Sequence, residues 1–271
     1  MLNGYYQVTG AMVTQFNKLD VTTNNLANVN TSGFRRDSVI IGDFERLYQE
    51  QRDILPLENS TKEGAKFLNR TINRVPRVVE NHIDFSAPNV KSTGNPLDFA
   101  LNDGDLFFAV ETPSGVRLTQ QSSFVIDSDG ALSTKEGYKL LPDNFEQLSV
   151  KEIKIPTNGN GILKLDKSGR LFSDSNEVAK LFITRVDNTK MLDKEGDNLY
   201  NLPDMEQNVA PLGEGNFVKQ GFKQMSNVNA VKEMVNLIEG SRLVEMYQKV
   251  MTGHMDELNR EAITKLAAVR A

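Results

Sequence analysis

Residues 1–30, MLNGYYQVTGAMVTQFNKLDVTTNNLANVN, and residues 228–269, VNAVKEMVNLIEGSRLVEMYQKVMTGHMDELNREAITKLAAV, share one pattern of apolar side chains. The pattern repeats at steps of three and four residues, which is the spacing of one helix face and of the seam of a coiled coil. A helix over residues 228–269 would be about 60 Å long, more than the width of a small domain. Such a helix needs a long partner, so the two ends predict terminal helices that pack together and assemble with other subunits.

The chain between these ends has a different pattern. Over residues 81–223, short alternating apolar runs are separated by Gly, Asn, Asp and Pro, which is typical of antiparallel strands joined by turns. We therefore expect an α+β fold with three parts. A discontinuous coiled-coil domain is formed by residues 1–34 and 224–271, residues 35–80 are an extended charged connector, and residues 81–223 are an antiparallel β-domain.

The composition argues against several classes of function. The 271 residues carry a formal net charge of -5 and no cysteine. This charge gives no general attraction to nucleic acid, and the lack of thiols excludes disulfides, thiol catalysis and cysteine zinc sites. No apolar run approaches the length of about 20 residues that crosses a membrane, and the N-terminus lacks the parts of a cleaved secretory signal. We expect no nucleic-acid binding and no membrane insertion.

The first helix is poor in charge. Lys18 and Asp20 are the only charged residues before Phe34, and the other polar side chains are amides and hydroxyls. A helix that faces water usually carries charge on its outer face, so this composition predicts packing by protein on several sides. The alternative is a floppy terminus, because Asn and Thr are mediocre helix formers. The turn-forming residues 28–33 predict where the helix ends.

The apolar stripes of the two helices supply the candidate assembly interface. Its residues are Leu2, Met12, Phe16, Leu19, Leu26, Met234, Ile238, Val244, Tyr247, Met251, Met255 and Leu258. Gly240 and Gly253 interrupt the second stripe, and each costs about 1 kcal/mol relative to alanine in a helix. They are either points where a neighbouring helix approaches closely or tolerated defects.

No stretch has the pattern of a catalytic or metal site. His82 and His254 are far apart, and neither belongs to a cluster with ligand spacing. Residues 127–130 begin like a calcium loop but lack its closing Glu, and residues 158–161 resemble a phosphate loop that no Lys-Ser/Thr follows. Both segments are interpreted as turns. We expect no enzyme activity, no cofactor and no bound metal.

Two smaller patterns concern the middle of the chain. Residues 126–132, IDSDGAL, resemble residues 165–171, LDKSGRL, and predict two similar hairpins. A basic stripe at residues 62–77 contains Lys62, Lys66, Arg70, Arg74 and Arg77. Acidic residues lie nearby, so the stripe is interpreted as part of a solvated or assembly-facing arm rather than a nucleic-acid surface.

The end of the first helix resembles a known signature. Residues 19–36, LDVTTNNLANVNTSGFRR, combine Asn-Leu-Ala-Asn with a Thr-x-Gly-aromatic-Arg ending and resemble flagellar basal-body rod and hook proteins. Residues 226–239, SNVNAVKEMVNLIE, are similar to the start of the C-terminal helix of that family. Residues 95–100, NPLDFA, and 129–138, DGALSTKEGY, resemble its central domain. The resemblance therefore covers nearly the whole chain.

Some stretches depart from the family pattern. Residues 103–108, DGDLFF, are a variant of its Gly-Phe-Phe-rich turn. Residues 119–124, TQQSSF, lack the usual Thr-Arg-x-Gly spacing, so we expect this hairpin to differ in detail. Residues 242–251, RLVEMYQKVM, resemble the proximal rod members more than the distal ones.

The resemblance implies a structural function. A proximal rod member is a subunit of the bacterial flagellar basal-body rod, which polymerises helically into the periplasmic drive shaft between motor and hook. Its partners are further copies of itself and the other axial rod proteins, and contact with peptidoglycan or surrounding rings is left open. It leaves the cytoplasm through the flagellar type III apparatus without a cleaved signal. The alternatives are a distal rod or hook protein, a generic helical adhesin or tail protein and, remotely, a periplasmic wall-acting enzyme.

Overall fold

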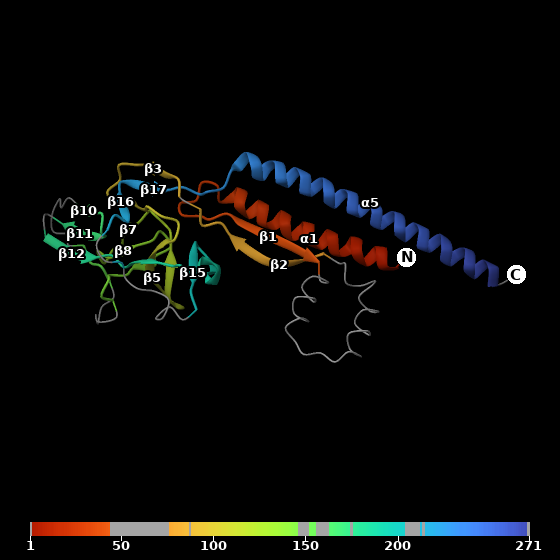
Figure 1. Ribbon diagram of the computed structural model, residues 1–271, viewed down its shortest axis with the longest axis horizontal. Helices are drawn as coiled ribbons and strands as arrows, with labels where there is room; N and C mark the ends of the chain where they lie inside the picture. The colour runs from red at the N-terminus through yellow and green to blue at the C-terminus, as the bar shows by residue number, and fades with distance from the viewer. Residues whose placement is uncertain are drawn as a thin grey trace. The chain divides into compact units, whose positions relative to one another are not determined.

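The chain forms two helices at its ends and antiparallel strands between them (Figure 1). The computed structural model describes residues 2–43, 76–86, 88–145, 152–155, 163–173, 176–203, 212 and 215–269. The chain divides into a helical unit, made of Met1–Ala27, Asp37–His82 and Asn229–Ala271, and a β unit, made of Asn28–Arg36 and Ile83–Val228. The expected α+β class is confirmed.

The helical unit is built around α1 (Leu2–Ala27) and α5 (Ala230–Val269). The two helices lie side by side and run in opposite directions (Figure 1). A two-stranded sheet of β1 (Asp37–Asp43) and β2 (Pro76–Ile83) belongs to the same unit, and β1 contacts α1. Asn25 fixes that contact, because its amide donates to the Asp37 carbonyl at 2.7 Å and accepts from the Asp37 N–H at 2.9 Å.

Hydrogen bonds between residues close in sequence determine where α1 ends and where α5 begins. The Asn229 side chain accepts from the Lys232 N–H at 3.1 Å, which caps the start of α5. After α1, the Thr31 N–H donates to the Asn28 carbonyl at 3.1 Å and closes the predicted turn. Gly33 ends this turn with a φ of 74°, and a Cβ there would lie 2.3 Å from the Gln120 carbonyl oxygen. The predicted end of α1 is confirmed, and only glycine fits at position 33.

Where its residues are described, the β unit consists of short strands and one turn of 3-10 helix. The strands whose pairing is described are antiparallel, and the largest sheet has the order β14-β15-β6-β5-β9-β8-β7, with β13 also paired to β5. The elements are β3 (Val90–Ser92), β4 (Phe99–Leu101), β5 (Leu106–Thr112), β6 (Gly115–Thr119), β7 (Val125–Ile126), β8 (Leu132–Ser133), β9 (Lys139–Leu140), β10 (Leu163–Leu165), β11 (Arg170–Ser173), β12 (Asn176–Lys180), β13 (Ile183–Arg185), η1 (Thr189–Met191), β14 (Asp193–Gly196), β15 (Leu199–Asn201), β16 (Val218–Gln220) and β17 (Phe222–Gln224).

Strand β5 lies between two apolar clusters. Leu106 and Phe108 pack into one cluster, while Phe107 and Ala109 pack into the other. Successive side chains of a strand point to opposite faces, so β5 is buried on both sides and its sequence is a continuous apolar run rather than an alternation. Late strands also close the unit, because β16 pairs with β4 and β17 pairs with β3.

The two similar segments form similar hairpins, as predicted. In the first, the Gly130 N–H donates to the Asp127 carbonyl at 2.9 Å, between β7 and β8. In the second, the Gly169 N–H donates to the Asp166 carbonyl at 3.0 Å, between β10 and β11. The Asp127 side chain accepts from the next backbone N–H at 2.7 Å, so it stabilises a turn.

The expected boundaries of the three parts remain predictions. Of the connector predicted over residues 35–80, residues 44–75 lie outside the described part of the chain. The side chains of the basic stripe at 62–77 lie outside it as well, and so does the turn predicted at residues 158–161.

Candidate assembly interface

The buried side chains of the helical unit are mostly polar. Thr14, Thr22 and Asn25 are buried on α1, and the buried residues of α5 are Glu233 and the apolar Val244. Both threonines donate to carbonyls of their own helix at 2.8 Å, which satisfies their hydroxyls without help from outside. The side chains of Asn17, Thr23 and Asn24, also on α1, are exposed, so the packing on several sides that the low charge of α1 predicts stays a prediction.

Close approach between the two helices occurs at Gly240. A Cβ at this position would lie 2.7 Å from Leu19 Cδ2 and 3.2 Å from Leu19 Cγ, both too close for ordinary contact. Nothing lies within 4 Å of a Cβ placed on Gly253. The two glycines therefore differ: Gly240 lets α1 and α5 touch, and Gly253 is tolerated where no neighbour of the chain requires it.

This difference predicts opposite effects of two substitutions. Gly240→Val should weaken the pairing of α1 and α5 by about 1–3 kcal/mol, because the new methyl groups overlap with Leu19. Gly253→Ala should stabilise α5 by about 1 kcal/mol through helix propensity alone. Thermal unfolding of the purified variants, followed by circular dichroism at the helix band, measures both. A Gly240→Val protein as stable as the wild type contradicts the close contact.

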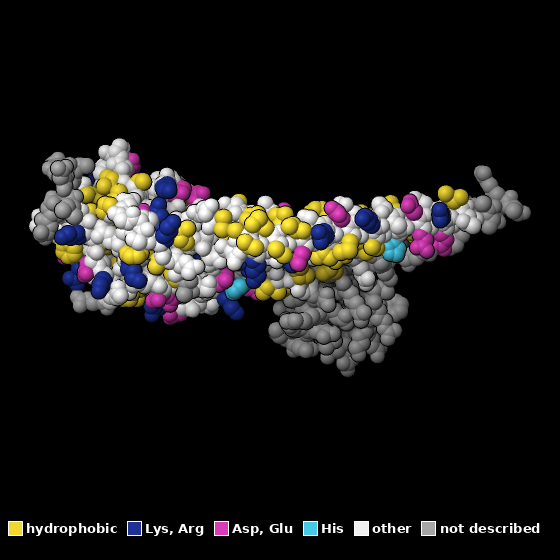
Figure 2. All heavy atoms as spheres, turned by 90° about the horizontal axis from the view of Figure 1, so that it is seen from above, with side chains coloured by type: hydrophobic (Ala, Val, Ile, Leu, Met, Phe, Trp, Pro, Cys, Tyr) yellow, Lys and Arg dark blue, Asp and Glu magenta, His cyan; other side chains and the backbone are white. Residues whose placement is uncertain are grey.

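Apolar side chains also cover the side of α5 that faces away from Gly240. Val231, Met234, Val235 and Ile238 are 68%, 45%, 48% and 51% exposed, and their spacing puts them on one helix face. We refer to these four residues as the outer face of α5. Figure 2 shows hydrophobic side chains gathered over the helices at the surface. Contiguous exposed apolar surface is typical of a protein-protein contact.

The predicted interface residues fall into separate groups. Val244 is buried, and Phe16, Met234, Ile238 and Met255 are exposed. The partly buried ones are Met12, Leu19, Leu26, Tyr247, Met251 and Leu258. Leu2 lies in α1, but its side chain is outside the described residues. What reads as one stripe in the sequence of α5 is therefore two faces, one toward α1 and one toward the surface.

Further exposed apolar residues were not among the predicted set. Val13 on α1 and Val231 on α5 belong to the apolar stripes that the sequence shows, whereas Val235, Met246, Val250 and Ile263 on α5 lie outside them. Most of them are sequence neighbours of a predicted residue. A single apolar stripe with steps of three or four includes only one residue of such a pair. Apolar residues on two sides of the same helix are the sequence signal that would have identified them.

The two helices also differ in length. α1 has 26 residues and α5 has 40. With Leu19 level with Gly240 and an equal rise per residue in antiparallel helices, the start of α1 lies level with about residue 257. The last turns of α5, which include the 67% exposed Ile263, therefore extend beyond α1 (Figure 1).

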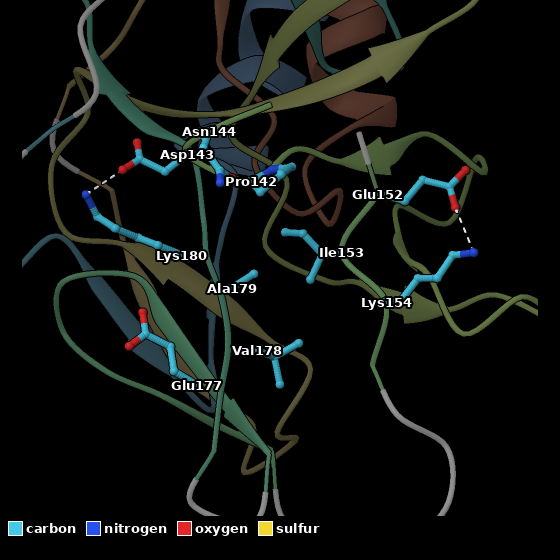
Figure 3. Close-up of a pocket in the computed structure, with 10 residues that line it drawn as sticks. All are labelled: Pro142, Asp143, Asn144, Glu152, Ile153, Lys154, Glu177, Val178, Ala179 and Lys180. Atoms are coloured by element: carbon cyan, nitrogen blue, oxygen red, sulfur yellow. Dashed lines mark hydrogen bonds and ion pairs between the residues drawn. The ribbon is translucent and has the colours of Figure 1, made fainter. Parts of the chain in front are cut away.

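The β unit has a hollow of about 470 Å³ that is lined by both charged and apolar side chains (Figure 3). Lys180 pairs with Asp143 at 2.8 Å, and Lys154 lies 3.8 Å from Glu152. Lys139 also binds Glu152 and holds the pKa of that carboxyl below its usual value. A wall hydrolase needs a general acid whose pKa is raised, so Glu152 is shifted in the opposite direction for that chemistry.

The remaining candidate sites do not come together. His82 is exposed on β2, and His254 is partly buried on α5. Within the described ranges, no group of three or more His, Cys, Asp or Glu side chains could hold a metal ion. Neither α1 nor α5 has, in its described residues, an apolar stretch long enough to span a membrane.

Three family models match the chain in order. Residues 6–35 match flagella basal body rod protein, and residues 102–172 match the D1 domain of flagellar hook protein FlgE/F/G. Residues 219–264 match the C-terminal region of flagellar basal body rod FlgEFG protein. The first and last of these matches coincide with most of α1 and α5, where the exposed apolar residues lie.

Curated relatives align over nearly the whole chain. The flagellar basal-body rod protein FlgG of Buchnera aphidicola subsp. Baizongia pistaciae is 30% identical over 255 residues, which cover 90% of this chain and 92% of the relative. The rod protein FlgF of Caulobacter vibrioides is 28% identical over 99% of this chain and 100% of its own. FlgG of Borreliella burgdorferi is 29% identical over 93% and 94%. Together with the matched regions, these alignments show that the chain belongs to the flagellar basal-body rod protein family.

Proposed function

We propose that this chain is a structural subunit of the bacterial flagellar basal-body rod. The observation that carries the proposal is the outer face of α5, which is apolar and about half exposed in the single chain. Apolar side chains exposed to water do not stabilise a single helix, whereas a contact between subunits of a polymer would bury them. Relatives that carry rod-protein names align along the helices that hold it.

The two helices are proposed to form the polymerising inner domain. Residues 1–34 and 224–271 make a coiled-coil layer, residues 35–80 connect it, and residues 81–223 form an outer β-domain. In this arrangement α5 packs on α1 with one face and on a neighbouring subunit with the other. A contact between two different surfaces repeats without closing and generates a helical filament, which is the architecture that a torque-transmitting shaft requires.

The proposed place of the subunit is the periplasmic part of the basal body. Its partners are other copies of the chain and the other axial rod proteins, and its route is type III export without a cleaved signal. The FlgF proteins of Caulobacter vibrioides and Rhizobium meliloti align with 99% and 100% of this chain and with all of their own lengths. A FlgG protein, that of Bacillus subtilis, aligns with 97% of this chain and 98% of its own length, so these alignments support the family, and the proximal position rests on the resemblance of residues 242–251.

No catalytic role is proposed. The relatives that the chain resembles are named as rod proteins, and two carboxylates of the hollow in the β unit, those of Asp143 and Glu152, are paired with lysines. The wall-acting alternative requires a carboxyl whose loss abolishes activity while assembly is retained, and nothing in the described residues favours one.

Deletion of the gene in its own host tests the function. We expect non-motile cells whose basal bodies end at an incomplete rod, seen by electron microscopy of isolated basal bodies. A plasmid copy should restore both swimming and the rod, because the loss is structural. Deletion cells that still swim would falsify the proposed role, and so would non-motile deletion cells whose basal bodies have complete rods.

A further inference from the structure

A fully buried arginine lies in the β unit, on the segment that follows α1. Arg35 is 0% exposed, and burial lowers the pKa of its guanidinium, while the charges of Tyr200 and Asp84 act against that shift. Neutral oxygens accept its hydrogen bonds. Nε donates to the Gln120 side chain, and Nη1 donates to the Ser86 carbonyl at 3.1 Å. A buried cation without such partners would be costly, so these groups must meet for the unit to close.

Gln120 and Gln224 extend the arginine's network. Gln120 Nε2 donates to the carbonyls of Gly104 at 2.7 Å and Leu106 at 2.9 Å. The Gln224 amide, oriented so that both of its groups are satisfied, accepts from Arg35 Nη2 and donates to the Gln120 carbonyl at 3.3 Å. Both glutamines are buried, and their sequence positions are more than a hundred residues apart.

A second set of hydrogen bonds lies beside the first. Asn227 Oδ1 accepts from the Arg36 N–H at 2.8 Å, and its Nδ2 donates to the Asp84 carbonyl at 2.8 Å. The Asp84 N–H in turn donates to the Arg36 carbonyl at 2.9 Å. The Gly33 N–H donates to the Gln224 carbonyl at 2.9 Å. These bonds tie the segment that follows α1 to the segment that precedes α5.

We propose that Arg35, Gln120, Gln224 and Asn227 form a clasp that positions the two terminal helices for pairing. The proposal rests on the proposed function, in which those helices polymerise. Both connections to the helices leave the β unit from clasped segments, at Asn28 and Val228. The clasp therefore keeps the two arms rooted together before the helices are paired.

Loop closure gives the direction of the effect. With the clasp closed, about 20 residues separate Leu19 from Gly240, counted from the two roots at Asn28 and Val228. With the segment around Arg35 released, the first arm is still tied to residue 83 through the Asn25–Asp37 bonds and the pairing of β1 with β2. It is no longer rooted at Asn28, so the loop that must close is longer and its closure probability is lower.

The contact between Leu19 and Gly240 supplies the assay. The chain has no cysteine of its own. The double substitution Leu19→Cys and Gly240→Cys removes the Leu19 side chain and places one thiol on each helix at the contact. In dilute purified protein treated with oxidised glutathione, the rate of the intramolecular disulfide reports how often the arms meet. Non-reducing electrophoresis separates the cross-linked monomer from intermolecular products.

Three variants are compared in this background. Arg35→Met should slow the intramolecular disulfide at least about twofold, because the first arm loses its root at Asn28. Asn227→Ala, which removes a partly buried side chain and is less disruptive, should slow it about twofold. Asn102→Ala is the matched control, because it removes a side-chain bond to the Asn216 carbonyl of 2.7 Å elsewhere in the β unit. It should leave the rate unchanged.

The near-ultraviolet circular dichroism of each variant shows whether the β unit is still folded. If Arg35→Met unfolds it, the comparison of Asn227→Ala with Asn102→Ala decides. Equal rates in folded clasp variants and in the control overturn the proposal. The assay uses no flagellum, so a clasp that fails here leaves the rod function intact, and motile deletion cells would refute the rod function without touching the clasp.

Discussion

Cells whose only copy of the chain carries both Val235→Asp and Ile238→Asp are expected to lose motility completely. These side chains are 48% and 51% exposed in the single subunit, so the monomer loses little packing. Asp has a helix propensity close to that of Val and Ile. In the polymer, however, each apolar side chain of this size contributes about 1.5–3 kcal/mol when fully buried, and a carboxylate at the contact would be buried without a partner.

The control for this pair is Gln248→Asp with Thr252→Asp. Both positions are exposed on α5 and polar in the wild type, so the variant adds the same number of charges, one helical turn apart, without removing apolar surface. Swimming in soft agar measures the function, and circular dichroism of the purified subunits measures the fold. Motile cells with the outer face changed, or equal defects in both variants, would remove the outer face from the assembly contact.

Substitution of Met251 or Leu26 by Asp is expected to act earlier, on the pairing of the helices within one subunit. Both side chains are partly buried, and Met251 shares the helix face of Gly240 and Val244 at steps of four and seven. A charge there opposes the packing of α5, so the helical signal of the monomer should fall together with motility. The β unit should stay folded, because its two apolar clusters contain neither residue.

Two spectral bands distinguish this result from the first. Far-ultraviolet circular dichroism at the helix band should drop for Met251→Asp and Leu26→Asp, whereas the aromatic signal of the β unit should be unchanged. The adjacent exposed Thr252→Asp is the matched change for Met251→Asp and should leave both bands and swimming intact. Normal swimming with either core-facing change contradicts the inferred pairing.

Local sequence signals predicted much of the fold. The turn formers after Ala27 ended α1 because Gly33 has a backbone conformation and a close neighbour that a side chain would not allow. The Asp-x-x-Gly segments formed hairpins because their hydrogen bonds close within a few residues. Such features depend on the nearest residues along the chain, and one sequence contains all of them.

Features that depend on distant residues were not predictable. Gly240 and Gly253 are equivalent in sequence, and only the position of Leu19 separates them. Arg35 reads as the charged end of a family signature, while its partner Gln224 lies almost two hundred residues later. The outer face of α5 was partly missed because the residues of its two apolar faces alternate along the sequence, and a pattern of three- and four-residue steps does not separate them. The spatial neighbour decides each case, and no local pattern encodes it.

The unequal lengths of α1 and α5 have a mechanical consequence for a polymer of such subunits. In the proposed helical filament, joints between helix pairs of equal length would have no helix running across them, and the filament would shear most easily there. A helix that is longer than its partner extends past the end of its own pair and bridges the joint to the next subunit. Torque applied to one end then has no common plane along which the subunits can slip.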